Sequence, residues 1–205
     1  AMLVGDLVMW ATELQPFWMG IFVSVTVGIA LTLPISSAAI CASFGLVGLA
    51  GGAAVAGCCA QMVGFAVMSF RENRWGGLVS QGLGTSMLQM PNIVRNPRIW
   101  IPPTLASAIT GPIATCVFKM EMNGAPVSSG MGTCGLVGQI GVVTGWLSPD
   151  AAALKNGAAA IVPTAFDWAG LVLICFVLPA VLSVVFCEIC RRLGWIKEND
   201  LKLPS

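Results

Sequence analysis

The stretch of sequence that decides the fold class is residues 14–70, which read LQPFWMGIFVSVTVGIALTLPISSAAICASFGLVGLAGGAAVAGCCAQMVGFAVMSF. This whole stretch contains no Asp, Glu, Lys or Arg. The solvated faces of a soluble domain carry charged side chains every few turns, whereas a charge at the centre of a bilayer costs roughly 2.5–3.5 kcal/mol on insertion scales. The stretch therefore predicts an integral membrane protein.

The composition of the whole chain agrees with this class. Charged residues make up 9% and hydrophobic residues 57% of the sequence, whereas soluble domains contain about 25% charged residues. Three further windows, 99–118, 122–149 and 168–187, also lack charged side chains. The net charge of +1, without a dense Lys/Arg cluster, argues against nucleic acid as a partner.

Hydrophobic length predicts where the chain crosses the membrane. About 20 apolar residues span the ~30 Å hydrocarbon core as a helix, and the sequence offers spans at 16–33, 45–70, 102–118 and 168–190. Residues 126–166 are interrupted by Gly and Pro, so we expect them to form re-entrant hairpins. The predicted fold class is an all-α polytopic membrane protein with about four spanning helices plus re-entrant or broken helical hairpins.

The positions of Lys and Arg predict the orientation. Four arginines lie between the second and third spans, and four basic residues follow the last span: Arg71, Arg74, Arg95, Arg98, Arg191, Arg192, Lys197 and Lys202. The positive-inside rule places both regions in the cytoplasm. Counting back over four spans puts the N-terminus there too.

An internal repeat is the sharpest pattern in the chain. The motif PISS (34–37) is followed by GLVG (45–48), and PVSS (126–129) is followed by GLVG (135–138). The span count predicts that the two copies are direct rather than inverted. We interpret residues 1–205 as a single transmembrane domain. Its first repeat covers about 14–70, a cytoplasmic connector covers 71–98, and the second repeat covers about 99–194.

The doubled motif predicts a solute site. Proline stops a helix, paired serines supply hydroxyls for freed carbonyls or a polar solute, and small residues let backbones approach closely. Corresponding broken segments in two halves point to the solute site of a transporter; the alternative is that they are only helix-packing faces. The predicted solute-binding residues are Ser36, Ser37, Gln61, Ser128, Ser129, Gln139 and Asn92.

Other polar and aromatic residues have ordinary explanations. Asp167 is interpreted as an interfacial helix cap rather than a buried functional carboxylate. The tryptophans fall near predicted boundaries and are interpreted as interface anchors, with sugar stacking by Trp146 as an alternative.

The sequence predicts no catalytic residue, cofactor or metal. Histidine is absent, which removes the commonest general base, metal ligand and phosphoryl carrier. Six of the eight cysteines lie in apolar segments and are interpreted as packing residues. Cys187 and Cys190 form the one remaining CxxC pair, and without a second pair or a histidine they do not predict zinc.

Three segments resemble a known family: LPISSAAICASFGLVGLAGGAAVAGCCAQMVGF, MPNIVRNPRIWIPPTLASAITGPIAT and APVSSGMGTCGLVGQIG. They are similar to the EIIC-like membrane domain of the phosphotransferase system, in the branch that includes the perfringolysin regulator protein, over about residues 6–203. Family members are typically longer, with further helices before this region, so the chain looks like the C-terminal part of such a protein or a short member that must assemble to complete itself. Conventional members often place a His or Glu near the sugar. Here histidine is absent and the glutamates fall outside the predicted site.

The resemblance implies a permease-like fold in the bacterial plasma (inner) membrane. Expected partners are membrane lipid, a small polar solute such as a sugar, a second copy in a homodimer, and either upstream membrane helices or cytoplasmic phosphotransferase proteins. The expected function is binding and translocation of the solute, as at most the permease component of a sugar phosphotransferase system. The alternatives are a membrane-embedded sensor that regulates gene expression without transport, and a passive solute channel.

Overall fold

The first charge-free stretch folds into two long helices that run in the same direction. In the computed structural model, which describes residues 15–203, these are α2 (Pro16–Thr32) and α4 (Gly48–Met68). Gly28 packs against Gly57, and Thr32 bonds to Gln61 one turn further along both helices. The short helix α3 (Ser37–Ser43) and its flanking loops carry the chain back between them.

Proline and small residues set these boundaries. Pro16 occupies the first turn of α2, where its missing N–H costs no hydrogen bond, and Pro34 follows the end of that helix. A Cβ on Gly57 would overlap the carbonyl of Ser24, so glycine is what allows α2 and α4 to pack so closely.

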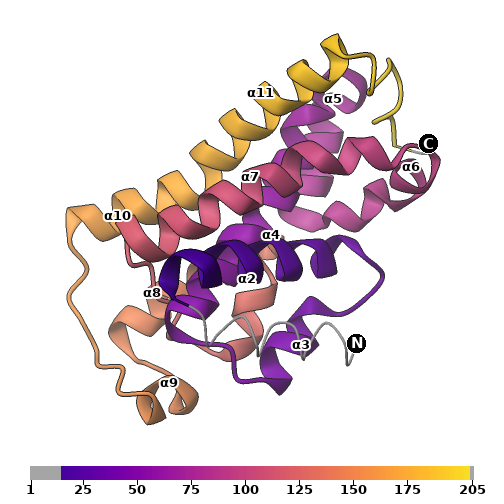
Figure 1. Ribbon diagram of the computed structural model, residues 1–205. Helices are drawn as coiled ribbons and strands as arrows, with labels where there is room; N and C mark the ends of the chain where they lie inside the picture. The colour runs from indigo at the N-terminus through magenta and orange to yellow at the C-terminus, as the bar shows by residue number, and fades with distance from the viewer. Residues whose placement is uncertain (1–14, 204–205) are drawn as a thin grey trace.

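The connector folds at the end of the bundle that α4 reaches. It consists of α5 (Phe70–Val79), a π-helical turn η1 (Ser80–Gly84), the 3₁₀ turns η2 (Ser86–Gln89) and η3 (Pro97–Trp100), and α6 (Met90–Arg95) between them. The tail residues 201–203 lie against it, so they are close to α5 and α6 (Figure 1).

The chain then runs back along the bundle. α7 (Ile101–Pro112) continues into the π-helical turn η4 (Ile113–Val117) and is antiparallel to α2. Ser24 donates to the carbonyl of Ser107 at 2.8 Å, while Gly20, nearer the start of α2, packs against Gly111. The broken segments follow as η5 (Pro126–Gly130), η6 (Cys134–Leu136), α8 (Val137–Leu147) and α9 (Ala151–Lys155).

The last helical stretch crosses the whole bundle. It comprises α10 (Ala165–Val172), the π-helical turn η7 (Leu173–Val177) and α11 (Leu178–Arg192). It runs parallel to α4, because Gly64 packs on Ser183 and Glu72 pairs with Arg191 two turns later. The π-helical turn precedes Pro179, so the helix continues through the proline.

These elements confirm an all-α membrane protein. Two helices, Gly48–Met68 and Ala165–Arg192, are long and apolar enough to cross a membrane, and Pro16–Thr32 and Cys134–Leu147 are shorter apolar helices. Within residues 15–203 there is no β-strand, only an isolated antiparallel bridge between Gly48 and Met122. The count of four spans stays a prediction.

The directions of the helices differ from the expected direct repeat. The helices that precede the two serine motifs, α2 and α7, are antiparallel to each other. In the first half, α2 is parallel to the long helix that follows the motif, α4. In the second half, α7 is antiparallel to the long helical stretch that follows the motif, α10 and α11. The two halves therefore have the same order of elements along the chain, but their helices run in different relative directions. The physical reason is that the 33–47 segment returns to the side from which α2 started.

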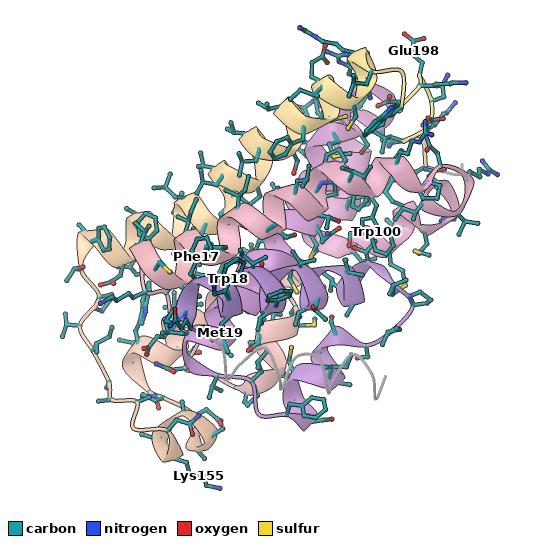
Figure 2. The ribbon with its side chains drawn as sticks, in the orientation of Figure 1. Phe17, Trp18, Met19, Trp100, Lys155 and Glu198 are labelled. Atoms are coloured by element: carbon teal, nitrogen blue, oxygen red, sulfur yellow. The ribbon has the colours of Figure 1, made fainter. Side chains whose placement is uncertain are left out.

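Pro16 and the C-terminal tail lie at opposite ends of the bundle. Lys155 on α9 and Glu198 in the tail mark opposite ends of the molecule (Figure 2). The start of α2 lies beside η4, since Thr115 donates to the carbonyl of Pro16 at 2.8 Å. Pro16 and the tail are thus at opposite ends of the bundle, whereas the span count predicts both termini on the same side of the membrane. The N-terminus itself belongs to residues 1–14, which lie outside the described residues.

Candidate functional site

The two serine motifs contact each other. Ser37, at the first turn of α3, donates to the carbonyl of Gly130 in η5 at 2.7 Å. Ser129 donates to the carbonyl of Leu46 at 2.5 Å. Both serines are buried. Segments more than 80 positions apart in the sequence therefore meet through hydroxyl–backbone bonds, so these hydroxyls hold the two halves together.

Irregular backbone surrounds this contact. Gly45, Gly48, Gly132 and Gly135 all have positive φ, a conformation that glycine adopts without a steric penalty. Gly48 and Met122 exchange two backbone hydrogen bonds of 3.0 Å each. Non-helical backbone at membrane depth must find partners inside the protein, and these bonds supply them.

Gln139 and Ser128 belong to the second of the two broken segments, residues 126–147. With the amide nitrogen of Gln139 turned toward the backbone, it donates to the carbonyls of Gly132 and Leu136 at 3.1 and 3.3 Å. This orientation satisfies the amide, since its oxygen would otherwise face only other acceptors. Ser128 is buried and packs beside Gly141. Ser36 is exposed and caps α3 by accepting from the N–H of Ala39.

Gln61 has a different position and a different role. It is fully buried on α4, ten residues beyond the glycine that packs on Ser129, which is about 15 Å along a helix. Its Oε1 accepts from Trp100 Nε1 at 3.0 Å and from Thr32 Oγ1 at 3.3 Å, and its Nε2 donates to Thr104. Gln61 therefore links α2, α4 and the start of α7, away from the serines.

Asn92 is also separate from the serines. It lies in the connector and donates to Gln89 Oε1 and to the carbonyl of Lys202, both at 2.8 Å. The structure thus brings together Ser36, Ser37, Ser128, Ser129 and Gln139, and leaves Gln61 and Asn92 in other networks.

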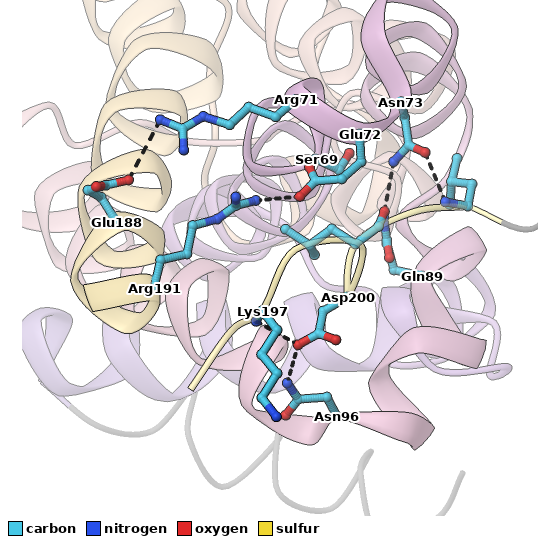
Figure 3. A network of polar contacts seen from close by, with 12 residues as sticks. Ser69, Arg71, Glu72, Asn73, Gln89, Asn96, Glu188, Arg191, Lys197 and Asp200 are labelled. Atoms are coloured by element: carbon cyan, nitrogen blue, oxygen red, sulfur yellow. Dashed lines mark hydrogen bonds and ion pairs between the residues drawn. The ribbon is translucent and has the colours of Figure 1, made fainter. Parts of the chain in front are cut away.

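Side-chain amides of the connector bind the backbone of the tail. Asn73 donates to the carbonyl of Leu201 at 2.7 Å and accepts from the N–H of Leu203 at 2.8 Å (Figure 3). Gln89 also donates to the Leu201 carbonyl, and Asn96 donates to Asp200. Asn73 and Gln89 bind the backbone of the tail, whereas Asn96 binds the side chain of Asp200 within a turn of the tail.

An ion pair lies beside the tail network. Arg191 Nη2 is 2.7 Å from Glu72 Oε1, and the two side chains are only 15% and 7% exposed (Figure 3). This pair fastens the end of α11 to α5.

A polar pocket at the opposite end was missed by the sequence analysis. Its volume is about 240 Å³, and it lies between the end of η4, the 119–121 segment, α8 and α10. Its lining includes Phe118, Lys119, Glu121, Trp146, Ile161 and Asp167. The sequence signal for this pocket is the pair of charges, Lys119 and Glu121, that lies between two uncharged windows.

The cysteines do not form a reactive or metal-binding centre in the described part of the chain. All eight are free thiols, and no group of three or more His, Cys, Asp or Glu residues within 15–203 could share a metal ion. The Cys41 thiol in α3 is fully buried.

Comparison with known proteins gives one match. The family model described as "Phosphotransferase system, EIIC" matches residues 1–203. No curated protein and no solved structure matches the chain. The closer relation to the regulator branch stays a prediction. Because the match covers nearly the whole sequence, the chain belongs to the EIIC family of the phosphotransferase system, which makes it a bacterial membrane protein of the sugar-permease type.

Proposed function

We propose that this protein binds a small polar solute, a sugar, and translocates it across the bacterial plasma membrane. The observation that carries the proposal is the contact between the two broken segments, in which Ser37 bonds to Gly130 and Ser129 bonds to Leu46. The contact lies at the start of α4, and paired broken segments are the elements from which transporters build solute sites.

The contact also suggests how a solute opens the space between the two broken segments. Ser37 and Ser129 use their hydroxyls on backbone carbonyls, so the two segments are closed on each other. A hydroxyl-rich solute offers the same donors and acceptors and can replace these bonds as the segments separate. Exchange of equivalent hydrogen bonds keeps the free-energy cost of opening small.

The proposal includes two kinds of partner. Exposed apolar side chains on α11, among them Val181, Val184 and Val185, fit lipid or a second copy of the chain. The connector and tail, with their arginines and lysines, fit the cytoplasmic phosphotransferase proteins that act with this family.

Flux into liposomes tests the proposal. The full chain is reconstituted, and uptake of radiolabelled monosaccharides is measured as a function of concentration. A carrier that alternates between two states gives uptake that saturates. Flux that rises linearly indicates a passive channel, and binding without net flux indicates a sensor; either result contradicts the proposal.

The sensor alternative has one observation in its favour. The tail is held by four amide side chains of the connector, Asn73, Gln89, Asn92 and Asn96. A segment held this way can be released and can bind another protein, which is how a ligand-dependent state could be passed to the cytoplasm. Binding without flux, combined with ligand-dependent protease sensitivity of the tail, would identify this function.

A further inference from the structure

We propose that the polar pocket between η4, α8 and α10 is the site at which the solute is first bound, and that it accepts a single neutral sugar ring. The inference rests on the proposed function, and it assigns that function an entry site and a ligand size. The pocket lies at the end of the bundle opposite the arginine-rich connector. By the positive-inside rule this end faces out of the cell.

The charged groups of the pocket each keep one hydrogen-bonding position available. Asp167 uses Oδ2 to accept from the N–H and hydroxyl of Thr164, both at 2.7 Å, and its Oδ1 accepts no bond from residues 15–203. Glu121 uses Oε2 to accept from Asn123 at 2.8 Å, and its Oε1 is similarly unused within the described chain. Each carboxylate is therefore oriented by one oxygen and can accept from a ligand with the other.

Lys119 supplies the complementary donors. Its ammonium forms no ion pair with any acidic residue of the described range, although Glu121 is two positions away. A sugar carries hydroxyls that both donate and accept, so it can satisfy two carboxylate oxygens and an ammonium at once. A ligand of one charge would leave at least one of these groups without a suitable partner.

Two of the lining side chains, Trp146 and Phe118, are aromatic, and each packs against a second ring outside the pocket. The Trp146 ring packs edge-to-face on Trp168, with centroids 5.1 Å apart, and Phe118 stacks on Phe166 at 4.9 Å. Aromatic side chains combined with a few convergent polar groups are a usual feature of small-molecule sites. The volume of about 240 Å³ is below the roughly 300–1,000 Å³ of sites for drug-sized ligands, which favours one ring over a disaccharide.

The backbone connects this pocket to the broken segments. Lys119 has a φ of +46°, a conformation that non-glycine residues adopt only where the surroundings impose it. It turns the chain out of η4 so that Met120 can bond to Ala114 and Met122 can pair with Gly48 at the start of α4. A ligand that binds Lys119 or Glu121 therefore contacts the segment that is paired with α4.

Binding by isothermal titration tests the proposal on the full chain in nanodiscs. The probes are D-glucose, D-mannose, D-fructose and, as a larger ligand, maltose. Lys119→Gly removes the ammonium and also the backbone strain of a positive φ at residue 119. The affinity of this variant for a sugar can therefore fall without loss of folding. Arg74→Gly is the matched control, since Arg74 is an exposed cation with a φ of +50° at the opposite end.

We expect a monosaccharide to bind and maltose not to bind. Lys119→Gly and Glu121→Gln should each weaken that binding about tenfold or more without lowering thermal stability, and Arg74→Gly should not change the binding. If a sugar binds and is transported but both pocket variants keep wild-type affinity, the pocket assignment is wrong and the proposed function stands. If the pocket variants lose binding but the wild type shows no flux, the assignment stands and the transport function is wrong. If no probe binds the wild type, both are overturned.

Discussion

The hydroxyl of Ser37 donates to the carbonyl of Gly130 at 2.7 Å, across a separation of 93 positions in the sequence. The bond joins the first broken segment to the second in a buried environment, where an unpaired carbonyl is costly. It makes the contact between the two halves a defined interface rather than a general packing of small residues.

Replacement of the buried serines should destabilise the protein. Ser37→Ala and Ser129→Ala each leave a buried carbonyl without its partner, so each should lower the free energy of unfolding by roughly 1–3 kcal/mol. Denaturant unfolding in detergent measures the change. Ser43→Ala is the control, because Ser43 is exposed and bonds only to Ala39 in its own helix; equal effects at all three sites would argue against a special interface.

The close approach of α2 and α4 should depend on Gly57. In Gly57→Ala, the new methyl overlaps the backbone of Ser24, which is part of a neighbouring helix and cannot move aside cheaply. Overpacking of this kind costs about 1–3 kcal/mol and more when backbone must shift. Thermal unfolding provides the measurement.

Gly76→Ala is the matched control for this prediction. Nothing lies within 4 Å of a Cβ at Gly76, which is in helix α5. Alanine there should raise stability by up to about 1 kcal/mol through helix propensity. A Gly57→Ala protein as stable as the wild type would contradict the observed helix contact.

The buried ion pair between Glu72 and Arg191 should contribute far more to the free energy of unfolding than the exposed pairs of Glu188. In Glu72→Gln, Arg191 keeps its charge without a carboxylate, and breaking a buried pair in this way costs roughly 3–5 kcal/mol. The comparison is Glu188→Gln, since Glu188 is 44% exposed and lies 3.8 Å from Arg71 and 3.6 Å from Arg192. Exposed pairs contribute at most about 1 kcal/mol. Unfolding measured at low and high salt should show a salt-sensitive effect only for Glu188; similar losses in both variants would be inconsistent with the structure.

Loss of Asn73 should release the C-terminal tail. Asn73 makes two of the bonds that hold the tail, to Leu201 and to Leu203. We expect Asn73→Ala to raise the rate of tryptic cleavage after Lys197 and Lys202 roughly tenfold, because cleavage follows the population of the open tail. Mass spectrometry of timed digests measures the cleavage rate. Asn156→Ala is the control, because Asn156 is an exposed residue that follows α9 at the other end of the molecule. Unchanged cleavage in Asn73→Ala would mean that Asn73 does not hold the tail.

The sequence predicted the positions of the long helices better than their directions. The predicted spans 16–33 and 45–70 correspond closely to α2 and α4, because hydrophobic length and Pro34 set those ends. The direction of each helix depends on whether a broken segment returns to its starting side. Hydrophobicity carries no information about that choice, since both paths are equally apolar.

The candidate site was predicted only where the repeat marked it. The doubled motif contains Ser37 and Ser129, which the structure joins to each other's segments. Gln61, Asn92 and Gln139 were selected as polar residues in or beside apolar segments, and the partners of Gln61 and Asn92 are tertiary. The polar pocket was missed because Lys119 and Glu121 are separated from Trp146 and Asp167 by more than 20 positions. Only folding places them around one cavity.

The most direct test of the central claim is counterflow of a monosaccharide in proteoliposomes, which requires no phosphotransferase partner. Vesicles containing the protein are loaded with unlabelled sugar and diluted into labelled sugar. We predict transient accumulation of label above its external concentration, abolished in protein-free vesicles, because a carrier exchanges one bound solute for another. Labelled sugar that only equilibrates, or does not enter at all although it binds to the protein, would contradict the claim that this chain carries solute across the membrane.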